Sequence, residues 1–460
     1  MDFLGRTKEL ATLEAQYADR RGAFIVVYGR RRVGKTSLLR QFVASRPAIY
    51  FHGTQAPREL QIRELLREAA SVLDQPLLAR VSQASWKEAL EACIDSYRGD
   101  DRLIIVLDEF QWMADSSPEL ASVLQELWDR SWQRSSKVML ILCGSYVGFM
   151  EREVLGRKSP LFGRRTAQVL LRPFGYREAA EFHPRYSAAD KARAYFICGG
   201  IPHYLRVFRP DKSIEQNIAD SVLHEHGPLF READFLLREE LREVESYFAL
   251  LVRLAQGAAT PAELATETSV GQSVQYYLKQ LLELGYIERN YPLTRKRPKR
   301  SQVRYALADP LLRFWFRFVQ PNQSFLQRYG GKRGLTERVK PQLPAYFGGC
   351  FERLCREAVP LLHEREGLVA DAQTGSFWSN DAQIDVVSLR SDDWIELGEC
   401  KWGTVRSPKA MLEELERKVP HYPNDSGSTV VRRLFTRSSV KPATSSHDVR
   451  WHSVGELYAP

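Results

Sequence analysis

Gly29-Arg30-Arg31-Arg32-Val33-Gly34-Lys35-Thr36 is the stretch that decides the fold of the first part of the chain. An apolar, β-branched run at residues 24–28 precedes it, and residues 37–42 repeat apolar side chains at helical spacing. The stretch therefore lies on a turn from a buried strand into a helix. The glycines allow backbone N–H groups to point at phosphates, and the helix N-terminus adds the positive end of its dipole. The pattern predicts a nucleoside triphosphate site.

Each residue type in this stretch suits a part of that ligand. Lys35 can reach the outer phosphates, and the Thr36 hydroxyl can coordinate Mg²⁺. The residues expected to bind the nucleotide here are Gly29, Arg32, Val33, Gly34, Lys35, Thr36 and Ser37.

A second strand candidate ends in two carboxylates. Five apolar residues, 103–107, lead directly into Asp108 and Glu109, as expected where the carboxyl edge of a buried strand faces a ligand. We expect Asp108 to hold Mg²⁺ through its water shell and Glu109 to activate the water that attacks the γ-phosphate.

Two further positions leave alternatives open. Ser145 follows the apolar run at residues 138–143, where it would either sense the γ-phosphate or cap a helix. Arg164 and Arg165 precede the apolar run at residues 167–171. Arg164 would either reach the γ-phosphate of a neighbouring subunit, which requires a homo-oligomer, or serve as surface charge.

The composition restricts the class of protein. At 460 residues the chain is long enough for about two to four domains. No apolar run approaches the roughly 18–20 residues of a membrane span, and the start lacks the layout of a signal peptide. The six cysteines lack zinc-like spacing. We expect a cytoplasmic protein without a membrane partner.

Residues 240–320 have the pattern of a winged helix. Helical periodicity covers residues 245–256, a Thr260-Pro261 start opens a second helix, and residues 270–284 give a third. A hairpin, residues 285–289 and 303–307, follows. Three helices and a hairpin are typical of winged helix-turn-helix domains.

A winged helix in this region predicts contact with nucleic acid, in the first instance DNA. The basic residues of the region, in a chain with a net charge of +9, support the same prediction. The alternative is a solvated loop on a domain used for protein contacts. The candidate DNA-binding residues are Gln272, Gln275 and Lys279 on the third helix and Arg295, Lys296, Arg297, Lys299 and Arg300 at the tip of the hairpin.

The last 120 residues contain a carboxylate and lysine pattern. Asp385 lies on one predicted strand, and Glu399 and Lys401 share a face of another. Glu352 lies upstream, in the first turns of a helix that we expect to begin near residue 347. This is the PD-(D/E)xK nuclease pattern, in which Glu352, Asp385 and Glu399 would bind Mg²⁺ and Lys401 would act on the attacking water.

The order of these motifs resembles the prokaryotic ATPases between the AAA+ and STAND groups, including archaeal ATPases. The likeness rests on the opening at residues 3–10, the phosphate-binding stretch, Asp108-Glu109, Gly144-Ser145 and Gly199-Gly200-Ile201-Pro202. It implies ATP as the cofactor, adenine held by the opening segment, and Pro202 in a helical lid over the nucleotide. Glu399-Cys400-Lys401-Trp402 resembles the nuclease-like domain of unknown function that often follows such ATPases.

The predicted fold is therefore α/β, with a parallel sheet in the order 5-1-4-3-2 and a separate restriction-endonuclease-like domain. We expect an ATPase core at residues 1–175, a helical lid at 176–238, a winged helix-turn-helix at 239–325 and the nuclease-like domain at 340–460. One hypothesis is an ATPase that binds DNA and couples nucleotide state to metal-dependent cleavage, in defence, mobile elements or repair. The other is an ATP-dependent DNA-binding regulator whose nuclease-like domain is structural.

Overall fold

The structure is a computed structural model that describes residues 3–81, 84–241, 243–441 and 448–459. It divides into two compact units, Met1–Pro173 and Phe174–Pro460, here called the first and the second unit. The boundaries of the four smaller domains expected from the sequence stay predictions.

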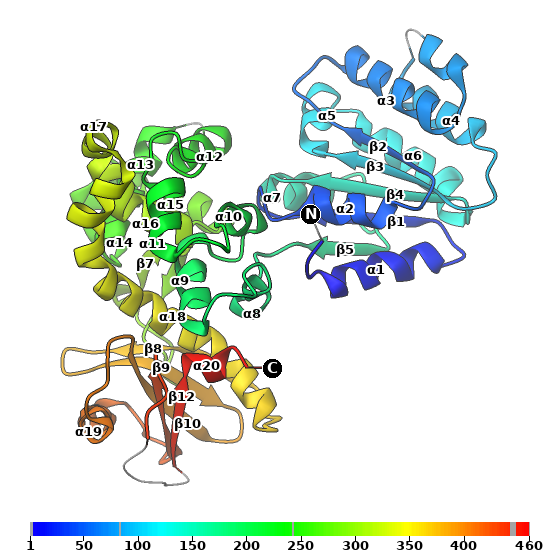
Figure 1. Cartoon of the computed structure of the whole chain (residues 1–460). Helices are drawn as coiled ribbons and strands as arrows, with labels where there is room; N and C mark the ends of the chain where they lie inside the picture. Colours follow the sequence, from blue (N-terminus) through cyan, green and yellow to red (C-terminus); the bar gives the residue numbers. More distant parts are fainter. Residues whose placement is uncertain (1–2, 82–83, 242, 442–447, 460) are drawn as a thin grey trace. The chain divides into compact units, whose positions relative to one another are not determined.

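The first unit is built on a five-stranded sheet in the order β2-β3-β4-β1-β5 (Figure 1), with every neighbouring pair parallel. The predicted order 5-1-4-3-2 is confirmed. Its elements are α1 (Thr7–Ala18), β1 (Ala23–Tyr28), α2 (Lys35–Val43), β2 (Ala48–His52), α3 (Arg58–Val72), η1 (Pro76–Arg80), α4 (Trp86–Ser96), β3 (Leu103–Asp108), α5 (Phe110–Ser116), α6 (Leu120–Arg130), η2 (Trp132–Arg134), β4 (Val138–Gly144), α7 (Val147–Phe149), η3 (Met150–Val154) and β5 (Ala167–Leu170).

Both faces of this sheet are covered, which explains the continuous apolar runs in its strands. Phe24 and Val26 of β1 belong to one core cluster that includes residues of α3, α4 and α6. Ile25 and Val27 alternate with them on the opposite face and are fully buried as well. Because both faces of the sheet are apolar, polar side chains lie at the ends of its strands.

The second unit begins with helices, followed by a two-stranded hairpin of β6 and β7. Its elements before the second sheet are α8 (Tyr176–Ala180), α9 (Ala188–Cys198), α10 (Pro202–Val207), α11 (Ile214–Asn217), η4 (Ile218–Val222), α12 (Glu232–Glu240), α13 (Val244–Gln256), α14 (Pro261–Glu267), η5 (Gly271–Ser273), α15 (Val274–Glu283), β6 (Ile287–Asn290), η6 (Arg300–Gln302), β7 (Arg304–Leu307), α16 (Pro310–Phe314), η7 (Trp315–Val319), η8 (Gln320–Asn322), α17 (Gln323–Gly334), η9 (Leu335–Val339), η10 (Lys340–Gln342) and α18 (Leu343–Arg365).

A second five-stranded sheet completes this unit, in the order β12-β11-β10-β9-β8. Strands β8, β9 and β10 pair antiparallel, whereas β10, β11 and β12 pair parallel. The elements are β8 (Ala372–Trp378), β9 (Gln383–Arg390), β10 (Trp394–Lys401), α19 (Pro408–Lys418), η11 (Val419–His421), β11 (Thr429–Thr436), β12 (Val449–Ser453) and α20 (Val454–Leu457).

Helix α18 corrects one expectation from the sequence. It begins at Leu343 rather than near residue 347, so Glu352 lies well inside the helix and not in its first turns. Gly348 and Gly349 do not interrupt it, because Leu343, Phe347 and Phe351 bury an apolar stripe on either side of them. Packing therefore overrides the low helix propensity of glycine.

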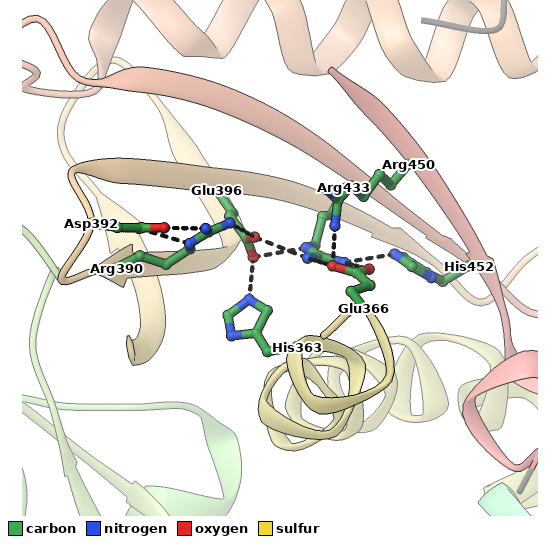
Figure 2. Close-up of polar contacts among 8 residues, drawn as sticks. All are labelled: His363, Glu366, Arg390, Asp392, Glu396, Arg433, Arg450 and His452. Atoms are coloured by element: carbon green, nitrogen blue, oxygen red, sulfur yellow. Dashed lines mark hydrogen bonds and ion pairs between the residues drawn. The ribbon is translucent and has the colours of Figure 1, made fainter. Parts of the chain in front are cut away.

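A buried network of charges joins α18 to strands β9–β12 (Figure 2). The Arg433 side chain is 0% exposed and donates hydrogen bonds to both carboxylate oxygens of Glu396 and of Glu366, at 2.7–2.9 Å. His363 Nε2 lies 2.8 Å from Glu396 Oε2, and His452 Nε2 lies 3.0 Å from Arg433 Nη1. An uncompensated buried charge is costly. The ion pairs and hydrogen bonds of Arg433 and Glu396 therefore hold β10, β11 and β12 against one another and against the end of α18.

Two members of this network have shifted pKa values. Burial, followed by the charge of Arg433, lowers the pKa of His452 to about 4, whereas Glu366 opposes this shift and Arg450 adds to it. Burial alone would raise the pKa of Glu396, but hydrogen bonds from His363 and Arg433 hold it at about 2.

We expect the second unit to lose stability as the pH falls from about 6.5 to about 4. Unfolded His452 takes up a proton near pH 6.5 and the folded residue only near pH 4, so the unfolded state binds more protons between these values. Glu396 contributes in the same direction from pH 4.5 to about 2. At about 1.4 kcal/mol per pKa unit, His452 accounts for at most about 3.5 kcal/mol.

Chemical denaturation at several pH values checks this expectation. His452→Gln keeps an acceptor for Arg433 but cannot titrate, so its free energy of unfolding should vary less between pH 6.5 and 4.5 than that of the wild type. Equal slopes for the two proteins would contradict it.

Candidate functional site

The turn between β1 and α2 has the backbone of a phosphate-binding loop. Gly29 has a φ of 153°, and a Cβ atom there would lie 2.3 Å from the carbonyl oxygen of Leu171. Gly34 caps α2 with a φ of 99°. Lys35 Nζ donates to the carbonyl oxygens of Gly29 and Arg30 at 2.8 and 3.0 Å. These two hydrogen bonds hold the Lys35 ammonium group against the loop.

The remaining predicted residues of the loop differ in burial. Val33 is fully buried and anchors the loop, whereas Ser37 is exposed at the start of α2. Arg32 adopts a left-handed φ of 65°, which is uncommon for a residue with a side chain.

Asp108 at the end of β3 is the polar centre of this edge. Its side chain is 0% exposed, and its Oδ2 accepts hydrogen bonds from Thr36 Oγ1 at 2.9 Å and from Tyr50 Oη at 2.8 Å. His52 Nδ1 lies 3.5 Å from the same oxygen. Burial alone would raise the pKa of Asp108, but hydrogen bonds from His52, Cys143, Tyr50 and Thr36 hold this pKa far below its ordinary value. Asp108 therefore carries a negative charge next to the loop.

Glu109, Gln111 and Ser145 form a second polar group beside Asp108. Ser145 Oγ donates to Glu109 Oε2 at 2.7 Å, and Gln111 Nε2 donates to the same carboxylate oxygen and to Ser145 Oγ, the latter at 3.1 Å. Glu109 itself has a left-handed φ of 54°. Ser145 is not a helix cap, since α7 begins at Val147 with Tyr146 as its N-cap.

The opening segment is fastened to the loop by a buried arginine. Arg6 Nη2 donates to the carbonyl oxygens of Val33 at 3.0 Å and Arg172 at 2.8 Å, and Arg6 Nη1 lies 3.0 Å from Glu9 Oε1. Only 6% of Arg6 is exposed. Arg6 therefore positions the loop from its far side.

Arg164 and Pro202 have other surroundings. Arg164 forms a bidentate ion pair with Asp129 of α6, with its shortest contact at 2.7 Å. Pro202 is buried at the first position of α10 in the second unit. The roles of Arg164 as a finger and of Pro202 in a lid stay predictions.

The predicted carboxylates of the second unit lie near one another. Val386 of β9 pairs with Gly398 of β10, which puts Asp385 beside Glu399. Asp385 Oδ2 accepts the backbone N–H of Cys400 at 3.0 Å, and Gln383 Nε2 lies 3.4 Å from Asp385 Oδ1.

Glu352 interacts electrostatically with these carboxylates. Burial, and then the charge of Asp385, raise the pKa of Glu352 to about 7. The same two causes raise the pKa of Glu399. Over the residues that the structure describes, however, no group of three or more His, Cys, Asp or Glu side chains is arranged to hold a metal ion. The expected three-carboxylate metal set is therefore not assembled here.

Lysines bind the oxygens of Glu399 instead. Lys401 Nζ lies 3.2 Å from Glu399 Oε1, as expected for two residues on one face of a strand, and Lys418 Nζ donates to Glu399 Oε2 at 2.5 Å. Burial alone would lower the pKa of Lys401, but the charges and hydrogen bonds of Glu399 and Glu414 raise it above its ordinary value.

The predicted DNA-contacting residues are exposed, but two of them are already in ion pairs with carboxylates of the second unit. Gln275 and Lys279 lie on the solvent side of α15, and Gln272 lies in the short η5 turn rather than in the expected third helix. Arg295 forms an ion pair with Asp393 at 2.6 Å, and Lys296 forms one with Asp425 at 2.6 Å.

The segment after β6 explains these pairs. Leu293 is buried in the core of the second sheet, and its backbone N–H donates to Ser376 at 2.8 Å. The start of the basic run, Arg295 and Lys296, therefore packs against the second sheet and does not extend into solvent as the tip of a hairpin. Arg297, Lys299 and Arg300 remain exposed.

Several residues of both sites escaped the sequence analysis. Tyr50 and His52 could have been found, because they alternate with buried Ile49 and Phe51 at the carboxyl end of a strand. Arg6, Gln111 and Lys418 carry no such signal, because their contacts with Val33 and Arg172, with Ser145 and with Glu399 join segments far apart in the sequence.

Two family models match the chain. Residues 3–208 match an ATPase domain found predominantly in Archaea, and residues 315–419 match DUF234, described as archaeal and bacterial proteins of unknown function. An uncharacterized protein of Methanocaldococcus jannaschii is 30% identical over 429 residues, which cover 90% of this chain and 91% of that protein. The chain therefore belongs to the family of that protein, with an archaeal-type ATPase domain followed by a DUF234 domain.

Solved structures are similar to the chain at lower identity. The Walker-type ATPase PABY2304 of Pyrococcus abyssi is 23% identical, with 69% of this chain and 96% of that chain covered and a TM-score of 0.53. The ORC2 protein of Aeropyrum pernix, solved in ADPNP–ADP complexes, is 17% identical, with 71% and 96% covered and a TM-score of 0.49. The first likeness shows a P-loop ATPase fold.

Across the described part of the chain, no helix has both the length and the apolar character that a membrane crossing needs.

Proposed function

We propose that the protein binds ATP with Mg²⁺ at the turn formed by residues 29–36 and hydrolyses it. One observation carries this proposal: the Thr36 hydroxyl donates to buried, charged Asp108, next to Glu109. A hydroxyl and an ionised carboxylate at the mouth of a glycine-bent loop are the donors that Mg²⁺ takes beside a triphosphate. When bound, Mg²⁺ neutralises charge on the phosphate oxygens.

The chain's own residues then have separate tasks. Lys35 binds the outer phosphates, and the backbone N–H groups of Val33 and Gly34 line the phosphate path. Glu109 orients the attacking water, and Ser145 and Gln111 fix the Glu109 carboxylate through hydrogen bonds to its Oε2. Tyr50 keeps Asp108 in place in the same way.

A second candidate function concerns the second unit, in which a helical domain with a hairpin binds DNA and the carboxylates cleave it under control of the nucleotide. It is favoured by Asp385 and Glu399 lying side by side with Lys401 Nζ 3.2 Å from Glu399. Metal ions would have to displace Lys418 from Glu399. The competing function is a DNA-binding regulator in which these ion pairs are structural.

Removing the phosphate-binding lysine tests the ATPase. Lys35→Ala should abolish ATP hydrolysis without unfolding the protein, and Glu109→Gln should lower the turnover rate roughly 10²-fold or more while ATP still binds. Exposed Lys137→Ala and Glu119→Gln serve as matched controls. Calorimetric ATP binding and phosphate release measure the two effects, and normal turnover by Lys35→Ala would disprove the assignment.

DNA binding should depend on the exposed part of the basic run. Replacing Arg297, Lys299 and Arg300 with alanine should lower the salt slope of duplex binding by about 2 to 3, because each phosphate contact contributes about 0.9. Replacing Arg295 and Lys296, which are already ion-paired, should change it less. Equal effects of the two sets, measured by fluorescence anisotropy, would contradict this arrangement.

A cleavage assay separates the nuclease from the regulator. If the second unit is a nuclease, wild-type protein with Mg²⁺ or Mn²⁺ cuts nucleic acid, and Asp385→Asn and Lys401→Ala each remove the activity. Glu413→Gln on the exposed side of α19 should keep it. Intact DNA and RNA in the presence of ATP, ADP and no nucleotide would favour the regulator.

A further inference from the structure

A cavity of about 670 Å³ lies within the second unit and is lined only by residues of that unit. Its walls come from α9, β6, α16, α18 and β8. This volume is in the range of small-molecule sites. One of its lining residues, Arg356, donates to the backbone oxygen of Asp385 at 2.6 Å, so the cavity borders the carboxylate cluster.

The lining of this cavity, which we call the arginine cavity, carries an excess of positive charge. Four arginines face two carboxylates, which leaves a formal charge of +2: Arg289, Arg313, Arg353 and Arg356 against Glu288 and Glu357. Such an excess is costly in a partly desolvated space unless an anion offsets it.

The arginines also repel one another. Burial, and then the charge of Arg313, lower the pKa of Arg353 to about 10; the charge of Glu288 opposes this shift and that of Arg356 contributes to it. Glu288 is the ion-pair partner of Arg353. The two oxygens of Glu357 accept hydrogen bonds from the Tyr176 N–H at 3.0 Å and the Tyr195 hydroxyl at 2.9 Å.

Two polar atoms in the walls lack partners. Arg313 Nε and Thr374 Oγ1 are buried and make no hydrogen bond within the described part of the chain. Buried polar groups of folded proteins are nearly always paired, so an orphaned donor and an orphaned hydroxyl in one cavity indicate a missing partner.

The rest of the lining suits a planar group. Tyr291 lines the cavity and is 41% exposed, and Phe196 forms part of the wall. Asn290 and Gln373 add amide groups that both donate and accept hydrogen bonds. A ligand with an anionic end and an aromatic, polar ring would use all of these features.

We propose that the arginine cavity binds a nucleotide by its phosphate, with Arg313, Arg353 and Arg356 around the phosphate and the base against Tyr291. The nucleotide is either free or the phosphorylated end of a nucleic acid strand, since both present the same chemistry. Binding here requires neither ATP hydrolysis in the first unit nor cleavage at Asp385.

Calorimetry of the full-length protein in EDTA tests the cavity without the metal-dependent steps. The probes are thymidine monophosphate, a 5′-phosphorylated octathymidylate and an octaglutamate peptide. Arg313→Gln and Arg353→Gln should weaken binding of the nucleotide probe at least about tenfold, because each loses a charge-assisted hydrogen bond to phosphate. Arg317→Gln, exposed and four residues from Arg313, should change it less than about twofold.

Thr374→Val serves as a second variant that leaves all charges in place, and it should also weaken the probe. Binding of the monophosphate identifies a free nucleotide, and binding of the octathymidylate alone identifies a strand end. Binding of octaglutamate only, binding of no probe, or unchanged affinity in the arginine variants would overturn the proposal. Loss of ATPase activity by Lys35→Ala is measured with Mg²⁺ and is independent of each of these results.

Discussion

The first unit depends on one buried carboxylate at the end of a strand. Asp108 has no contact with solvent, and hydrogen bonds from His52, Cys143 and the hydroxyl groups of Tyr50 on β2 and Thr36 on α2 stabilise its charge. These hydrogen bonds fix the spacing between the phosphate-binding turn, β2 and β3 at the edge where the strands end. The apolar runs supply the stability of the sheet, whereas this carboxylate determines which loops meet at its edge.

For the first unit, the sequence was sufficient to predict most of what the structure contains. Uninterrupted apolar strands and glycines at a strand-to-helix turn predicted the parallel sheet and the loop at Gly29 and Gly34, and the resemblance to prokaryotic ATPases implied the strand order. These signals are local or repeat with a short period. The contacts of Arg6 with Val33 and Arg172 could not be predicted, because they depend on how distant segments pack.

For the second unit, the sequence predicted which residues share a strand face but not the contacts that these residues make with other elements. The period-two pattern placed Glu399 and Lys401 on one face, and they are in contact. The pattern could not show that Lys418 of α19 competes for Glu399, or that Leu293 enters the core of the second sheet and draws the basic run with it. We expected the helix to begin near residue 347, but tertiary packing extends it to Leu343.

The network around Arg433 has a consequence for synthesis of the chain. Glu366 and Glu396 are made well before β11 brings Arg433 and β12 brings Arg450 and His452 to them. Until those strands leave the ribosome, Glu366 lacks its partners Arg433 and Arg450, and Glu396 has only Arg390 and His363 to offset its charge. The second sheet therefore closes late in translation, and a nascent chain that stalls before residue 433 keeps α18 and β10 open to chaperones and proteases.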